Sequence, residues 1–125
     1  MMTTTAPVAA SQLNASFGLP DHLTFRDGPG GLIMAHVRNA HASARIALHG
    51  AQVLSYIPRG KADLLWVSSE SHYEEGKAIR GGIPICWPWF GPHPAGANFP
   101  SHGFARNTLW QVVGAEQLPD GATQL

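Results

Sequence analysis

The segment from Ile79 to Arg106, IRGGIPICWPWFGPHPAGANFPSHGFAR, limits the folds open to this chain more than any other part of it. It holds five of the ten prolines, two of the four tryptophans and three of the five phenylalanines. Each proline lacks the amide donor that a helix interior or a central strand needs. Disordered segments are poor in aromatic residues, so a disordered linker is excluded as well. The segment is therefore predicted to be a long ordered loop, held by prolines and buried rings, and such loops in small domains usually carry function.

Short alternating segments on both sides of this loop predict an all-β, antiparallel fold. Within residues 32–39, for example, Ile33, Ala35 and Val37 fall on one face, which is the period of a half-buried strand. Strands are predicted over Leu23–Arg26, Leu32–Asn39, Ala42–Leu48, Gln52–Ile57, Asp63–Val67 and Leu109–Ala115, with Ala122–Leu125 as the return strand of a hairpin. Short strands about ten residues apart, separated by Gly/Pro turns, are typical of an antiparallel sandwich or barrel.

The two ends of the chain differ in what they predict. The first twenty residues carry no charged side chain and no continuous apolar run, so they do not resemble a signal peptide. We expect residues 1–22 to be a flexible tail and residues 23–125 to be part of one β-domain. The return strand at 122–125 has only four residues, which would leave the kind of open sheet edge that native proteins avoid. We therefore expect the end at Leu125 to be a truncation and not a designed C-terminus.

Charge and cysteine content exclude several classes of function. Eight basic and eight acidic side chains cancel, which gives no electrostatic reason to expect nucleic acid or an anionic membrane as partner. The few arginines are therefore expected to act locally, at particular positions, and not as a patch. No stretch approaches the roughly 20 apolar residues of a membrane span. The single cysteine, Cys86, excludes an internal disulfide, which suits a cytoplasmic protein.

Cys86 is also a weak candidate for chemistry. It lies in an apolar run with no base beside it, where a thiol is usually inert. Cys86, His93 and His102 match no compact ligand spacing, so a metal site is not favoured.

Two clusters within the loop could bind a ligand. Next to Arg80, Gly81-Gly82 would let the backbone approach a ligand while the guanidinium holds an oxyanion; a glycine bulge with a surface arginine is the alternative. In an extended chain, His102, Phe104 and Arg106 would lie on one side and could share a pocket. The alternative is a core histidine bonded to a backbone carbonyl.

The four tryptophans are predicted mainly to pack in the core. Trp66 and Trp110 lie on predicted strands, and Trp87 and Trp89 lie within the loop. Aromatic rings also stack on the apolar faces of sugars, so a ligand contact is the alternative for the loop pair.

Three segments, HGAQVLSYIPRGKADLLWVS, KAIRGGIPICWPWFGP and FPSHGFARNTLWQV in that order, resemble the N-terminal half of the aldose 1-epimerase superfamily. The resemblance spans roughly His49 to Val113 and is strongest to the hexose-6-phosphate (glucose-6-phosphate) 1-epimerases. It implies a large antiparallel β-sandwich of the galactose mutarotase type, a cytoplasmic monomer that needs no cofactor or metal. The implied reaction is interconversion of the α and β anomers of a hexose 6-phosphate.

The resemblance also assigns roles to residues. Arg80 and Arg106 match arginines that hold the substrate through its phosphate, Ser101 matches a substrate-contacting position where relatives can carry Gln, and His102 matches the pocket histidine of an H-G motif. The family's acid, a histidine, and its base, a glutamate, belong to the C-terminal half. We therefore expect no catalytic residue within these 125. The alternatives are a non-catalytic sugar-phosphate-binding module and, third, a Pro/Trp-rich protein-interaction loop.

Overall fold

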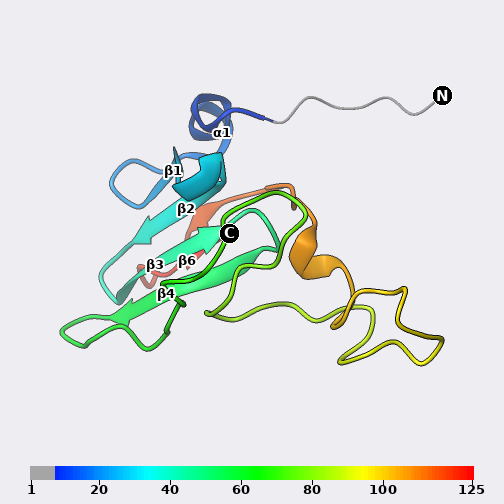
Figure 1. Ribbon diagram of the computed structural model, residues 1–125. Coiled ribbons are helices and arrows are strands. Elements are labelled where there is room, and N and C mark those ends of the chain that lie inside the picture. Colours follow the sequence, from blue (N-terminus) through cyan, green and yellow to red (C-terminus); the bar gives the residue numbers. More distant parts are fainter. Residues whose placement is uncertain (1–7) are drawn as a thin grey trace.

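The computed structural model describes residues 8–125. Four antiparallel strands form the main sheet in the order β1-β2-β3-β4 (Figure 1). They are β1 (Leu23–Asp27), β2 (Ile33–Arg38), β3 (Ala42–Ala47) and β4 (Gln52–Pro58), with the short 3-10 turn η1 (Pro29–Gly31) between the first two. Each strand pairs with the next one along the chain. The alternation of apolar and polar residues within each segment is therefore enough to predict most of the sheet. These four predicted strands are confirmed to within one residue at each end.

The two faces of this sheet are covered differently. On one face, Leu23, Phe25 and Ala35 form a buried cluster with Leu13 of helix α1 (Ala10–Phe17). On the other face, one end is apolar and packs beneath Ile79. The other end of that face carries polar and charged side chains. The cross-strand pairs on this polar end run Thr24–His36–Arg45–Ser55.

The prediction of a flexible tail over residues 1–22 is wrong for the described part, residues 8–22, which contains helix α1. Leu13 is only 5% exposed. The side chain of Asn14 donates to the carbonyl oxygen of Phe25 at 2.8 Å and accepts from the Phe25 amide at 2.7 Å. The helix therefore provides hydrogen-bond partners for backbone groups of the edge strand β1. Composition could not reveal this contact, because it joins residues that are eleven positions apart. Residues 1–7 of the expected tail lie outside the described residues.

The strand predicted at Asp63–Val67 is wrong. The carboxylate of Asp63 accepts hydrogen bonds from the Ser55 hydroxyl and from the backbone amides of Tyr56 and Leu65. These bonds fold the segment back on β4 in place of a strand ladder, and only Val67 forms an isolated bridge, to Gly81.

The C-terminal region is only partly as predicted. The hairpin is confirmed, because β5 (Glu116–Gln117) and β6 (Thr123–Gln124) pair around a turn at 118–122. The strand predicted at Leu109–Ala115 is wrong: Leu109 makes a single bridge to His49 and the residues that follow are irregular. Val112 and Ala115 nevertheless pack against the cluster beneath α1. No helix formed by residues 8–125 combines the length and apolar character needed to cross a membrane.

The proline-rich segment forms an irregular lobe beside the sheet, drawn yellow to orange in Figure 1. The long loop is confirmed, since η2 (Ala105–Asn107) is its only helical turn and it contains no strand. Most of its rings are not buried as predicted: Trp87 is 60% and Phe90 is 80% exposed, whereas Trp89 is half-buried. Core packing is also wrong for Trp66 and Trp110, which are 72% and 41% exposed, because the strands expected to turn them inward do not form.

Candidate functional site

A close backbone contact fixes the chain next to Arg80. Gly82 lies at φ 62°, and its amide donates to the carbonyl oxygen of Trp66 at 2.8 Å. A Cβ added at Gly82 would lie 2.1 Å from the carbonyl oxygen of Val53 in β4. Only glycine tolerates this combination of positive φ and contact. The Arg-Gly-Gly step therefore seats the backbone against β4 and leaves the Arg80 side chain exposed.

Gln52, at the start of β4, holds the backbone on both sides of Arg80. Its side chain is 0% exposed, and Nε2 donates to the carbonyl oxygens of Ile79 at 3.0 Å and Gly81 at 2.6 Å. The amide of Arg80 itself donates to the hydroxyl of Ser71 at 3.0 Å. Sequence reasoning missed Gln52; the only signal was a polar side chain at the head of an apolar strand.

Arg106 is anchored at the same end of the sheet. The amide of Gly50 donates to the carbonyl oxygen of Thr108 at 2.7 Å, and a Cβ added at Gly50 would lie 2.8 Å from the carbonyl oxygen of Arg106. Gly50 and Gln52 are two residues apart, at most about 7 Å between Cα atoms. The turn into β4 thus anchors the backbones of both predicted substrate arginines.

The side chain of Arg106 is oriented by Ser101. Its Nη2 donates to the Ser101 carbonyl oxygen at 2.9 Å, and its Nε is buried without a hydrogen-bond partner among the described residues. Ser101 therefore contacts the arginine through its backbone, while its side chain is exposed. Across residues 8–125 the one ion pair is Lys77–Glu74, so neither Arg80 nor Arg106 has a carboxylate partner. An unpaired guanidinium is suited to an anionic ligand.

His102 occupies a strained conformation. Its φ is 65°, in the left-handed region that costs a non-glycine residue about 1–2 kcal/mol. Its amide donates to the carbonyl oxygen of Gly91 at 2.8 Å, and its Nδ1 accepts from the Gly91 amide at 3.0 Å. The ring proton therefore lies on Nε2, which can donate to a ligand. The alternative of a core histidine bonded to a backbone carbonyl is wrong, because the half-buried ring accepts from an amide.

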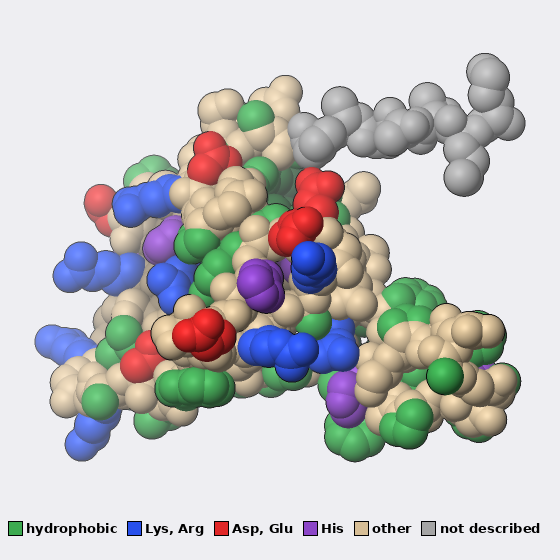
Figure 2. All heavy atoms as spheres, viewed as in Figure 1, with side chains coloured by type: hydrophobic (Ala, Val, Ile, Leu, Met, Phe, Trp, Pro, Cys, Tyr) green, Lys and Arg blue, Asp and Glu red, His purple; other side chains and the backbone are tan. Residues whose placement is uncertain are grey.

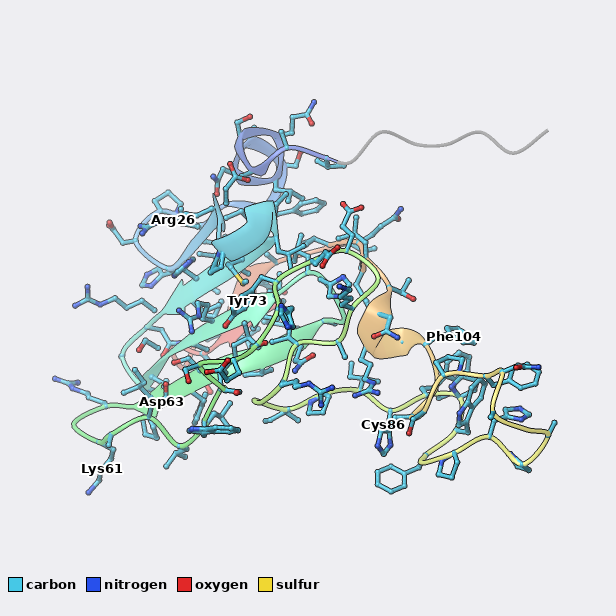
Figure 3. The ribbon with its side chains drawn as sticks, in the orientation of Figure 1. Arg26, Lys61, Asp63, Tyr73, Cys86 and Phe104 are labelled. Atoms are coloured by element: carbon cyan, nitrogen blue, oxygen red, sulfur yellow. The ribbon has the colours of Figure 1, made fainter. Side chains whose placement is uncertain are left out.

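The predicted extended chain over residues 102–106 is also wrong. The left-handed backbone of His102 and the turn η2 interrupt the alternation that would have aligned His102, Phe104 and Arg106. Phe104 is an exposed ring of the lobe. Figure 3 shows Phe104 and Cys86 in this region, away from the sheet.

Aromatic rings of the lobe pack against one another. Phe104 meets Trp87 edge-on at 5.9 Å and Trp89 at 6.1 Å between ring centroids. Phe90 lies 4.7 Å from the His102 ring. Edge-to-face contacts of this kind stabilise an aromatic cluster without a conventional core. They give the loop a ring-lined surface next to His102, of the type that can stack on a sugar face.

These residues lie at the surface between sheet and lobe. Figure 2 shows cationic and histidine side chains where the two parts meet. Three cavities, of about 650, 480 and 420 Å³, lie elsewhere, and none is lined by Arg80, Ser101, His102 or Arg106. The structure therefore brings the two arginine-bearing segments to one end of the sheet without enclosing them. No group of three or more His, Cys, Asp or Glu side chains within residues 8–125 is placed to hold a metal ion.

Comparison with known proteins identifies the family. The model of the aldose 1-epimerase family matches residues 34–125, which is most of the chain. The chain belongs to the aldose 1-epimerase family. The resemblance noted in the three sequence segments is thereby confirmed.

Relatives of this epimerase-family chain are considerably longer. It is 45% identical over 85 residues to a "Putative glucose-6-phosphate 1-epimerase" of Escherichia coli, a match covering 68% of this chain and 29% of the relative. The protein of the same name from Salmonella typhimurium is 50% identical over 85 residues, with the same shares covered. Each match thus spans less than a third of the relative's length.

Solved structures confirm the fold class. The crystal structure of a "putative mutarotase (YeaD)" from Salmonella typhimurium superposes with a TM-score of 0.72 at 42% identity, covering 77% of this chain and 32% of that one. The structure of HI1317 superposes with a TM-score of 0.67 at 36% identity, covering 77% and 34%. The antiparallel, mutarotase-like β-fold expected from the sequence is therefore confirmed.

Proposed function

We propose that this chain supplies the substrate-holding part of a glucose-6-phosphate 1-epimerase. The observation that carries the proposal is the pair Arg80 and Arg106, both without a carboxylate partner among residues 8–125 and both anchored at the turn into β4. Two guanidiniums at one end of a sheet can hold a phosphate dianion through charge-assisted hydrogen bonds. The names of the relatives support glucose 6-phosphate as the substrate.

In this proposal His102 and the aromatic rings bind the sugar. The free Nε2–H of His102 donates to a sugar oxygen, and the strained backbone directs that nitrogen. The exposed faces of Trp87 or Phe90 stack on the ring of the hexose. Ser101 acts through its carbonyl, which holds the guanidinium of Arg106 in place.

The chemistry is general acid–base catalysis. One group takes the proton of the C1 hydroxyl while another protonates the ring oxygen, and the ring closes from the other face after rotation about C1–C2. None of the described carboxylates is assigned as the base: Glu74 pairs with Lys77 at 2.9 Å, and Glu75 beside it is exposed. We place the acid histidine and the base glutamate outside these 125 residues, so this chain binds the substrate and does not turn it over.

Titration with glucose 6-phosphate and with glucose tests the binding. Arg80→Ala and Arg106→Ala should each weaken the binding of glucose 6-phosphate by about 1.5–3 kcal/mol, which is a loss of affinity of about 10- to 150-fold. The affinity for glucose should change far less. Arg59→Ala is the matched control, because it removes an exposed arginine from the turn after β4. Equal losses for both sugars would argue against a phosphate contact.

Exchange NMR of the anomers tests the catalysis. The 125-residue chain should leave the rate of α–β exchange of glucose 6-phosphate at its uncatalysed value. Binding without acceleration is also what the alternative, a non-catalytic binding module, requires. A longer natural chain that accelerates exchange would decide for the epimerase, whereas acceleration by the 125 residues alone would overturn the assignment of the acid and base.

A further inference from the structure

A hollow on the polar end of the main sheet is separate from every residue assigned above. Its volume is about 650 Å³, within the range of small-molecule sites. Its lining comes from all four strands and includes three of the eight basic side chains of the protein, Arg26, Arg38 and Arg45. Three of the arginines, which the sequence predicts to act at particular positions and not as a patch, therefore line one hollow.

The strand register brings two of these arginines to either side of His36. His36 of β2 pairs directly with Arg45 of β3 on one side and with Thr24 of β1 on the other. Arg26 lies two residues beyond Thr24 on the same face. Strands β1 and β3 are about 10 Å apart across β2, a gap that two arginine side chains can close around one phosphate group.

The register places His36, Arg26 and Arg45 on the same face of the sheet. Burial lowers the pKa of His36, and the charges of Arg26 and Arg45 lower it further. A neutral imidazole between two cations adds a hydrogen-bond donor without adding to their repulsion. The hydroxyls of Thr24, Ser43 and Ser55 in the lining provide further donors.

The positive charge of this hollow is only partly neutralised by the protein, because two carboxylates lie in the lining beside the three arginines. Within residues 8–125 the three arginines have no carboxylate within 4.0 Å, since the one ion pair is Lys77–Glu74. The two carboxylates are those of Asp21 and Asp63, fewer than the three arginines. Asp63 accepts three hydrogen bonds from β4 and its own loop, of which that from the Ser55 hydroxyl lowers its pKa most, and the charge of Arg45 is the smallest of the causes that lower it. Figure 2 shows cationic side chains gathered along this side of the molecule, and Figure 3 shows Arg26 and Asp63 at opposite edges of the sheet.

We propose that this hollow is a second anion site that binds a phosphorylated small molecule, with the phosphate held between Arg26 and Arg45 beside His36. The volume exceeds that of a bare phosphate, so the rest of the ligand lies over Ser43 and Ser55. Polar lining from four strands suits a polar metabolite and not an apolar one. Its occupation would affect the stability of the sheet from which Arg80 and Arg106 are positioned.

Pyrophosphate is the probe, titrated into the 125-residue chain at physiological ionic strength with NMR signals of the His36 ring as the readout. Saturable shifts are expected, and Arg26→Gln or Arg45→Gln should each weaken the affinity by at least about tenfold. Arg80→Gln should leave the His36 response unchanged, which separates this site from the proposed substrate site. The side chains of Arg26, Arg45 and Arg80 are exposed, so their replacement should leave the fold intact. Melting curves of the three variants would verify this.

Arg59→Gln is the matched control for charge, because Arg59 is exposed and does not line the hollow. An equal loss of affinity in Arg59→Gln, or shifts that do not saturate, would overturn the proposal in favour of general electrostatics. Phosphatidylcholine vesicles with and without phosphatidylglycerol form a second arm. Co-sedimentation that depends on phosphatidylglycerol and Arg45, with no saturable pyrophosphate binding, would identify a lipid surface as the ligand and overturn the small molecule.

Discussion

Replacing Gln52 by methionine is expected to weaken both the fold and the proposed arginine site. The buried amide donates to the carbonyl oxygens of Ile79 and Gly81, at 3.0 and 2.6 Å. Each bond contributes about 1 kcal/mol, and each carbonyl left buried without a donor costs about 1–3 kcal/mol. Methionine keeps the side-chain volume and removes Oε1, a buried acceptor that has no partner, which offsets part of this loss. We expect the free energy of unfolding to fall by about 2–4 kcal/mol.

Urea unfolding of Gln52→Met beside Gln111→Met measures this effect. Gln111 is exposed, so the same substitution there should change stability by less than about 0.5 kcal/mol. The affinity of Gln52→Met for glucose 6-phosphate should also fall, because the two carbonyls flank Arg80. A stability loss no greater than that of Gln111→Met would refute the role of the amide in holding the loop. A large stability loss with full affinity would refute its connection to the ligand.

Three further changes test other parts of the fold. Leu13→Ala should lower the free energy of unfolding by about 2–5 kcal/mol, measured by thermal or urea unfolding, because α1 belongs to the core. A loss below about 0.5 kcal/mol would instead support a flexible tail at this position. Gly82→Ala should lower the free energy of unfolding by more than about 2 kcal/mol. Gly60→Ala is the control, because Gly60 has a similar φ but nothing within 4 Å of an added Cβ, and it should lower that free energy by about 1 kcal/mol. Equal losses in the two variants would refute the close contact of Gly82 with β4. Hydrogen bonds from the Ser55 hydroxyl, the largest cause, and from two backbone amides lower the pKa of Asp63. The ionised carboxylate therefore stabilises the folded state above the unfolded pKa of about 3.9. This stabilisation is lost as pH falls through the lower folded pKa. The stability gap between wild type and Asp63→Asn should therefore narrow in acid, and a gap that does not change with pH would contradict this.

The main sheet could be predicted because its pairing is local. The alternation of Ile33, Ala35 and Val37 selects a face, and each strand meets its neighbour in the chain. The prediction of a flexible tail failed because the fold of this segment depends on a contact between elements that lie apart in the sequence. Asn14 forms hydrogen bonds with the backbone of Phe25, eleven residues further along the chain. No periodic pattern in the N-terminal sequence indicates that contact.

The candidate site was predictable only in part for the same reason. The motifs around Arg80 and Arg106 marked the arginines themselves. Their anchor did not stand out, because the amide of Gln52 binds carbonyls 27 and 29 residues further along the chain. The exposure of the aromatic rings of the lobe could not be predicted either. Aromatic content distinguishes an ordered loop from a disordered one, but it does not say whether the rings face a core or one another.

The charge balance of this protein shows how a sum can mislead. Eight basic and eight acidic side chains cancel, yet the two signs occupy different places. Three of the eight acids lie within residues 69–77, while three arginines converge over β1, β2 and β3. Coulomb interactions fall off within about 10 Å in physiological salt, so distant carboxylates do not neutralise this hollow. A net charge of zero therefore leaves open a site for one phosphate, and only the strand register reveals where such a site can form.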